Sequence, residues 1–158
     1  MPDSILSDKE ISDLMIERKL FPKNYRDLFK TKDKKGHKEQ ELPILRGDGS
    51  QFKVILRQNQ INPLDFSLIL GYVPPKKTTV FRLRRYNGKS HQHSNKIEGE
   101  KFYNFHIHQA TERYQRAGFE EDAYAVSCSE YADTQGALDC FIKDCAIVLP
   151  TDDQLKLI

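Results

Sequence analysis

The spacing of apolar residues changes near residue 42, from a helical period to the period-2 alternation that is typical of β-strands. Before this point, Ile11, Leu14 and Met15 recur on one helical face. Ser7 and Glu10 precede them with the S-x-x-E spacing of a capping box, in which each side chain bonds the backbone N–H of the other residue. The pattern therefore predicts a first short helix.

A second helix is predicted from Pro22 to about Lys30. Proline suits the first turn of a helix because its missing N–H would have no partner there, and Phe21, Tyr25 and Leu28 follow at helical spacing. Residues 31–38 contain four lysines and no apolar side chain, which indicates a mobile basic loop.

The rest of the chain reads mainly as strands. Alternating segments are separated by short turn-rich pieces such as Asn62-Pro63, which favours antiparallel neighbours. Near the C-terminus, Asp133 can cap a helix whose apolar stripe includes Phe141. The predicted fold class is α+β: N-terminal helices and a C-terminal helix packed on one face of a four- to five-stranded antiparallel sheet. The predicted strands are 51–58, 65–72, 78–86 and 101–108, with 42–46 as a possible fifth.

Alternate side chains of a strand point to opposite faces, so each predicted strand divides into two sets. One set is almost entirely apolar and forms the predicted core. The opposite set is basic and contains no carboxylate, so we expect its counter-ion to arrive with a ligand; an ordinary solvated face is the alternative. The polar members of this predicted face are Lys53, Arg57, Ser67, Arg82, Arg84, Asn104, His106 and His108.

Composition and charge narrow the class of protein. The 158 residues, 38% hydrophobic and 30% charged, are typical of one domain, residues 1–158. Three cysteines without a CxxC pair, no apolar run near the roughly 20 residues of a membrane span, and no signal segment lead us to expect a cytoplasmic protein without a membrane partner. Residues 21–116 carry 20 basic and nine acidic side chains, a distribution that predicts binding to RNA or another polyanion.

Four of the five histidines form two His-x-His pairs, His91 with His93 and His106 with His108. The second pair lies on a predicted strand with both rings on the basic face. Such pairs can ligate a transition metal, can act as general acid and base while cations hold a phosphodiester, or can simply form hydrogen bonds. Neighbouring arginines and lysines would repel a dication, so acid–base chemistry is preferred to metal binding and no cofactor is predicted.

Two segments carry resemblances. Residues 84–93 (RRYNGKSHQH) and 106–115 (HIHQATERYQ) resemble an uncharacterised family of small prokaryotic proteins, which implies no mechanism. The order of helices and a basic, histidine-bearing sheet is similar in architecture to the metal-independent endoribonucleases of bacterial toxin–antitoxin systems. This resemblance implies His93, His106 and His108 as acid–base residues and Arg84 as the group that stabilises the transition state.

The sequence therefore predicts an RNA-binding protein with metal-independent endoribonuclease activity. The alternatives are a non-catalytic module that binds nucleic acid, a protein partner or an inhibitor, and a histidine-rich, metal-dependent enzyme. The residues predicted to bind RNA are Lys53, Arg57, Arg82, Arg85, Lys89, His91 and Tyr114.

Overall fold

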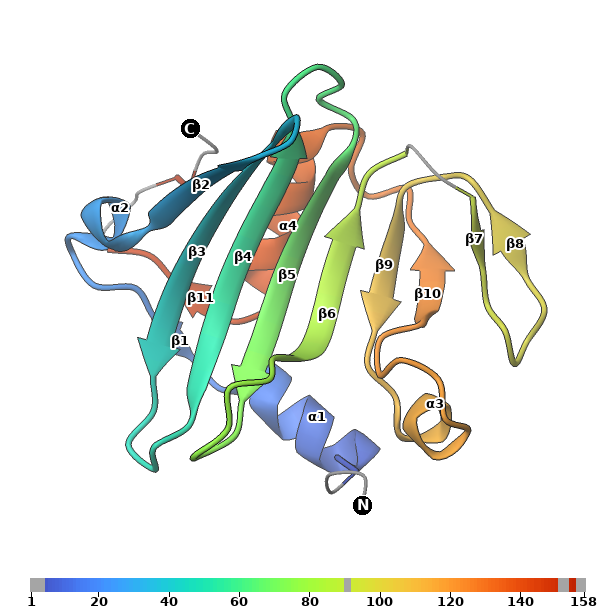
Figure 1. The fold of residues 1–158 in the computed structure, drawn as a ribbon, viewed down its shortest axis with the longest axis horizontal. Coiled ribbons are helices and arrows are strands. Elements are labelled where there is room, and N and C mark those ends of the chain that lie inside the picture. The colour runs from blue at the N-terminus through green and yellow to red at the C-terminus, as the bar shows by residue number, and fades with distance from the viewer. Residues whose placement is uncertain (1–4, 90–91, 151–153, 156–158) are drawn as a thin grey trace.

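The computed structural model describes residues 5–89, 92–150 and 154–155, and it is built around an antiparallel sheet of seven strands (Figure 1). The spatial order of the strands is β10-β9-β6-β5-β4-β3-β2, so neighbours in sequence are mostly neighbours in the sheet. The prediction of a mixed α/β chain with an antiparallel sheet is confirmed. The strands are β2 (Lys30–Lys34), β3 (His37–Leu45), β4 (Gln51–Asn59), β5 (Phe66–Val73), β6 (Phe81–Asn87), β9 (His106–Gln109) and β10 (Tyr124–Ser127).

Four helices and two small strand pairs complete the described part of the chain. One pair is parallel and brings together a segment after the first helix and a segment after the last helix. The other pair is an antiparallel hairpin outside the main sheet. The helices are α1 (Asp8–Ile16), α2 (Tyr25–Leu28), α3 (Glu112–Arg116) and α4 (Thr134–Asp144), and the pairs are β1 (Lys19–Leu20) with β11 (Ile147–Val148) and β7 (His93–Ser94) with β8 (Lys101–Phe102). Within the described residues, no helix is long and apolar enough to cross a membrane.

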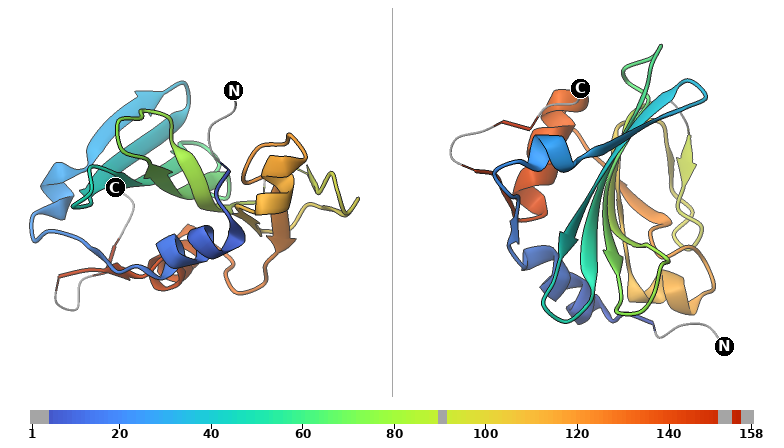
Figure 2. Two further views of the ribbon diagram at one scale, coloured as in Figure 1. Left: turned by 90° about the horizontal axis from the view of Figure 1, so that it is seen from below. Right: turned by 60° about the vertical axis from the view of Figure 1, so that its left-hand side comes forward.

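Helices α1 and α4 lie against the same face of the sheet (Figure 2). Their apolar stripes meet the alternating apolar side chains of the central strands, which are removed from water. Helix α4 begins at the predicted cap, where Asp133 accepts from the backbone N–H of Gly136. The core residues include Leu14 of α1, Phe52, Val54 and Leu56 of β4, Leu68 and Leu70 of β5, and Leu138 and Phe141 of α4.

Helix α1 is closed at both ends by side chains. The predicted capping box is confirmed, since Ser7 accepts from the backbone N–H of Glu10 and Glu10 accepts from that of Ser7. At the other end, the buried ammonium of Lys19 donates to the carbonyl oxygens of residues 14, 15 and 17 at 2.7–3.0 Å. Burial lowers the pKa of Lys19 to about 8. One side chain therefore satisfies three carbonyls that the helix leaves without partners.

The N-terminal third of the chain differs from the prediction. Residues 31–38 are not a loop, because β2 and β3 form a hairpin that turns at Gly36 with φ +80°. Every residue of β2 is exposed, so no alternation of apolar side chains marks this strand in the sequence. The predicted second helix is only the four residues of α2. The sheet thus has seven strands instead of four or five, because β2, a longer β3 and β10 extend it.

The last predicted strand is also divided. Residues 101–108 contribute two residues to the separate β7–β8 hairpin and three to β9 of the main sheet. Asn104 lies between these two strands and is therefore not a member of the sheet face.

Candidate functional site

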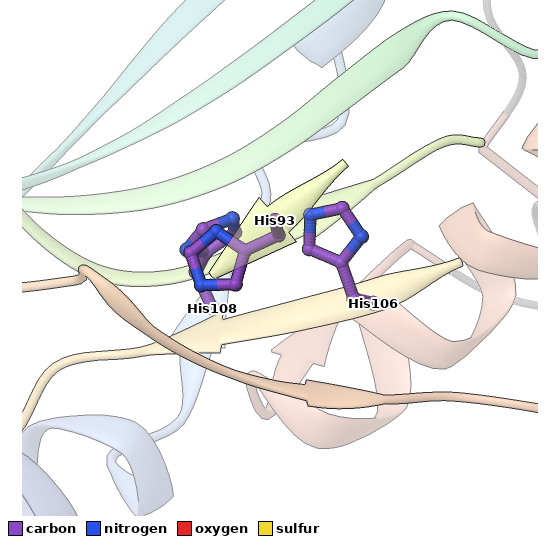
Figure 3. A group of neighbouring side chains, drawn as sticks. All are labelled: His93, His106 and His108. Carbon is purple, nitrogen blue, oxygen red and sulfur yellow. The ribbon is translucent and has the colours of Figure 1, made fainter. Parts of the chain in front are cut away.

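Three histidines converge on the sheet face opposite α1 and α4. His106 and His108 are two residues apart on β9, so both rings project from the same face, and the β7–β8 hairpin brings His93 beside them (Figure 3). The ring centroids lie 4.6–5.4 Å apart. One ring nitrogen from each histidine lies within 4.8 Å of those of the other two. The structure therefore brings together all three predicted catalytic histidines.

Each imidazole is oriented by one hydrogen bond from the ring to a protein oxygen. His106 Nδ1 lies 2.8 Å from the carbonyl oxygen of Asn104, and His108 Nδ1 lies 2.7 Å from that of Asp122. Because a carbonyl oxygen only accepts, both rings carry their proton on Nδ1 and leave Nε2 as an acceptor. His106 Nε2 also lies 3.4 Å from the side-chain amide nitrogen of Asn87, a long contact in which the amide donates.

The third ring is oriented by the side chain of Asn95. The amide of Asn95 is fully buried and pairs with Ala125 of β10, since Oδ1 accepts from the Ala125 N–H at 2.9 Å and Nδ2 donates to its carbonyl at 2.8 Å. This pairing fixes which end of the amide faces His93. His93 Nε2, 2.9 Å from Asn95 Oδ1, must therefore donate, which leaves Nδ1 of His93 as the acceptor.

Burial keeps the imidazoles of β9 neutral. It lowers the pKa of His106, and it lowers the pKa of His108 to about 2, with the neighbouring Arg85 charge acting in the same direction. A neutral imidazole with one proton on a structural hydrogen bond is the form that ligates a metal ion. Burial thus favours the neutral ring of His108, whereas a general acid must carry its proton near neutral pH.

The histidines form one wall of a cavity of about 220 Å³. The other walls are mainly polar, and Ser67 Oγ donates to Asn87 Oδ1 at 3.0 Å within them. The backbone is close-packed at Gly88, where an added Cβ would lie 1.8 Å from the carbonyl oxygen of Leu64. The cavity is lined by Asp65, Phe66, Ser67, Arg85, Asn87, Gly88, Gln92 and the three histidines.

Arg85 is the one arginine among these lining residues. It is the direct cross-strand neighbour of His108 in the pairing of β6 with β9. Its Nε lies 3.4 Å from the buried carboxylate of Asp122, which also lies 3.3 Å from Arg82. Burial lowers the pKa of Arg85 and raises that of Asp122. Asp122 thus lies beside two guanidiniums and, through its backbone carbonyl, orients His108.

Arg84 is not at this site, and its predicted position on the histidine face is wrong. The register of β5 with β6 shifts between Leu70 and Gly71. As a result, Arg84 lies opposite Leu70 on the face covered by α4. Arg85 is the residue that lies beside His108. A one-residue irregularity reverses the faces of all the residues that follow it.

The predicted absence of carboxylates from the basic face is also wrong. Glu39 and Glu41 of β3 pair with Arg57 at 3.3 Å and with Lys53 at 2.9 Å. Arg82 lies within 3.4 Å of Glu120, Glu121 and Asp122 in the connection before β10. The counter-ions of these cations come from the protein itself.

The remaining predicted RNA-binding residues do not join the cavity. Tyr114 is fully buried, and its hydroxyl donates to Glu98 at 2.5 Å, so its ring is not free to stack on a base. Lys89 is exposed beyond the end of β6, and His91 lies outside the described residues. Sequence reasoning missed Asn95 and Asp122, because their roles depend on contacts with strands more than ten residues away.

Comparisons of the chain with protein-family models, with curated proteins and with solved structures find no match. The chemistry of the site is therefore argued from its own geometry.

Proposed function

We propose that His93, His106 and His108 bind one divalent transition metal ion and that the protein is a metal-dependent enzyme that hydrolyses its substrate. The observation that carries the proposal is the orientation of the rings. Each of the three rings donates one N–H to a protein oxygen, so the other nitrogen of each ring can accept. The three rings lie together in one small cluster. Metal-ligating histidines in proteins almost always have such a partner on the other nitrogen.

The donor set fits zinc and its neighbours in the first transition series. Imidazole nitrogens suit zinc, copper, iron and nickel, and three histidines are the protein ligands of one class of catalytic zinc site. In a tetrahedral site with bonds of about 2.1 Å the ligand nitrogens are ~3.4 Å apart. One ring nitrogen of each histidine lies within 4.8 Å of those of the other two, so binding one metal ion requires the rings to approach by roughly 1–1.5 Å, a change that side-chain rotation can supply.

The surroundings of the cluster suit catalysis better than purely structural metal binding. Structural zinc sites are closed by four protein ligands, whereas catalytic sites have three and keep one position for water or substrate. Within the described residues the cluster contains three ligands, and these line a cavity. When bound there, such a metal lowers the pKa of water and polarises substrate oxygens. Asn87 and Ser67 supply polar groups that can orient a substrate beside it.

The test is metal analysis of protein purified without an affinity tag, followed by titration of the metal-free protein with Co²⁺ and Zn²⁺. We expect one ion per chain, with affinity reduced at least about 100-fold in His106→Ala. His37→Ala is the matched control, because His37 is on β3 and outside the cluster, and it should bind the ion as tightly as the wild type. Absence of stoichiometric binding, or equal losses in both variants, would overturn the proposal.

Metal-independent cleavage of RNA stays a prediction, and the same proteins distinguish it from this proposal. Mixed RNA is incubated with metal-loaded protein and with protein in excess chelator, each beside His106→Ala. Cleavage only with the metal supports the proposal and identifies RNA as a substrate. Cleavage that persists in chelator and disappears in His106→Ala would instead establish the metal-free mechanism.

A further inference from the structure

Arg85 and the histidine cluster face the same small volume. Arg85 and His108 are directly opposite each other on β6 and β9, where side chains on one face are about 5 Å apart at Cβ. Both side chains line the 220 Å³ cavity. Any ligand that binds a metal ion at the histidines therefore lies within reach of the Arg85 guanidinium.

Two positive groups would face the cavity once a dication is bound at the histidines. All three proposed ligands are neutral imidazoles, so the metal keeps its full charge of two. Arg85 adds a further positive charge beside the metal, and the buried carboxylate of Asp122 lies 3.4 Å from its Nε. Asp65, the lining carboxylate, lies 3.8 Å from His37 and accepts from Asn59. Within the described residues no carboxylate joins the three histidines as a ligand, so a bound metal ion and the Arg85 guanidinium would face each other in a partly buried volume, where charges interact strongly.

An anion between the metal and the guanidinium would contact both positive groups. We infer that the metal ion and Arg85 together bind an oxyanion, so that the substrate of the proposed enzyme carries a phosphate or carboxylate group. The inference rests on the proposed function. The planar guanidinium donates two parallel hydrogen bonds to such a group, and the metal binds another of its oxygens. The cavity volume suits one such group and its nearest substituents.

Arg85 is placed to contact a ligand in the cavity. Its Nε faces the Asp122 carboxylate at 3.4 Å, and its side chain also lines the cavity beside the histidines. A buried cation is stabilised when its N–H donors have partners, and an anion in the cavity would supply partners for the donors that face it. Arg82, by contrast, is held by three carboxylates and does not line the cavity.

The experiment uses the Co²⁺-loaded protein, whose visible absorption responds to a change of ligand at the metal. Inorganic phosphate and acetate are titrated in separate arms into wild type, Arg85→Met, Arg85→Lys and Arg84→Met. Arg84→Met is the matched control, because it removes the same charge one residue away on the opposite face of β6. Co²⁺ stoichiometry and thermal unfolding are measured for each variant, so that loss of anion binding is not confused with loss of the fold.

We expect at least one of the two anions to change the spectrum of the wild type. The dissociation constant of that anion should rise about 10- to 100-fold in Arg85→Met, by a smaller factor in Arg85→Lys, and less than about threefold in Arg84→Met. The arm that responds identifies the group as phosphate or carboxylate. If Co²⁺ binds but neither anion changes the spectrum, or Arg85→Met binds the anion as tightly as wild type, this inference is wrong and the metal proposal stands. If Co²⁺ does not bind, both fail.

Discussion

Substitution of Asn95 separates the two roles that its side chain combines. The amide closes the edge of β10 by pairing with Ala125, and its Oδ1 orients His93. Of the three acceptors that orient the ring N–H groups, Asn95 supplies the only side chain, because His106 and His108 donate to backbone carbonyls. It is therefore the one acceptor that a substitution can remove.

Asn95→Ala should lower both metal affinity and stability. Loss of an outer partner of a metal-ligating histidine typically costs 10- to 100-fold in affinity, so the dissociation constant of Zn²⁺ should rise by about that factor. The N–H and the carbonyl of Ala125 would also lose their partners in a buried position. Each such group costs about 1–3 kcal/mol, so the free energy of unfolding should fall by about 2–6 kcal/mol.

Asn95→Asp keeps the acceptor that orients His93 but loses part of the pairing with Ala125. A carboxylate still accepts from His93 and from the Ala125 N–H, but it cannot donate to the Ala125 carbonyl or to Glu100. We expect Zn²⁺ affinity within a few-fold of wild type, together with a loss of stability that persists. Affinity is measured by competition with a chromophoric chelator, and stability by urea unfolding of the metal-free proteins. Equal losses of affinity in Asn95→Asp and Asn95→Ala would refute the reasoning.

Three further predictions concern stability. Zn²⁺ at 100 times its dissociation constant should raise the free energy of unfolding by about 2.7 kcal/mol, and chelator should reverse this; a melting temperature independent of Zn²⁺ would contradict it. Gly88→Ala should cost at least about 3 kcal/mol in thermal unfolding, because its Cβ would overlap the Leu64 carbonyl oxygen. Gly47→Ala, with open space at its Cβ, should change stability by less than about 0.5 kcal/mol. Burial lowers the pKa of Lys19 from 10.5 to about 8, so the unfolded state binds more protons between these values. The stability of wild type relative to Lys19→Met should therefore rise by about 3 kcal/mol from pH 8 to 10.5, and parallel urea-unfolding profiles would count against a buried charge.

The sequence predicts those parts of the fold in which one face is buried. Phe52, Val54 and Leu56 recur at every second position because α1 and α4 cover one side of β4. The same reasoning places His106 and His108 on a common face, since only the strand period is needed. It fails for β2, whose backbone pairs with β3 although every side chain is exposed.

The remaining errors concern contacts between distant segments. Arg84 and Arg85 exchange faces because of the shift beside Gly71, and alternation alone does not reveal such an irregularity. The alternation of apolar residues predicts only residues 42–46 of β3. It therefore does not reveal the ion pairs of Arg57 with Glu39 and of Lys53 with Glu41, which lie in the earlier part of that strand. Charges counted along a chain therefore overestimate the free charge of a folded surface.

The third histidine belongs to a different structural unit from the other two. His106 and His108 are fixed in the seven-stranded sheet, whereas His93 is held there by the β7–β8 hairpin, which Asn95 and Glu98 attach to β10 and α3. The apparent metal affinity then equals the intrinsic affinity multiplied by the population of molecules with the hairpin attached. A substitution such as Glu98→Gln, which touches no ligand, would thus tune metal occupancy by changing that population.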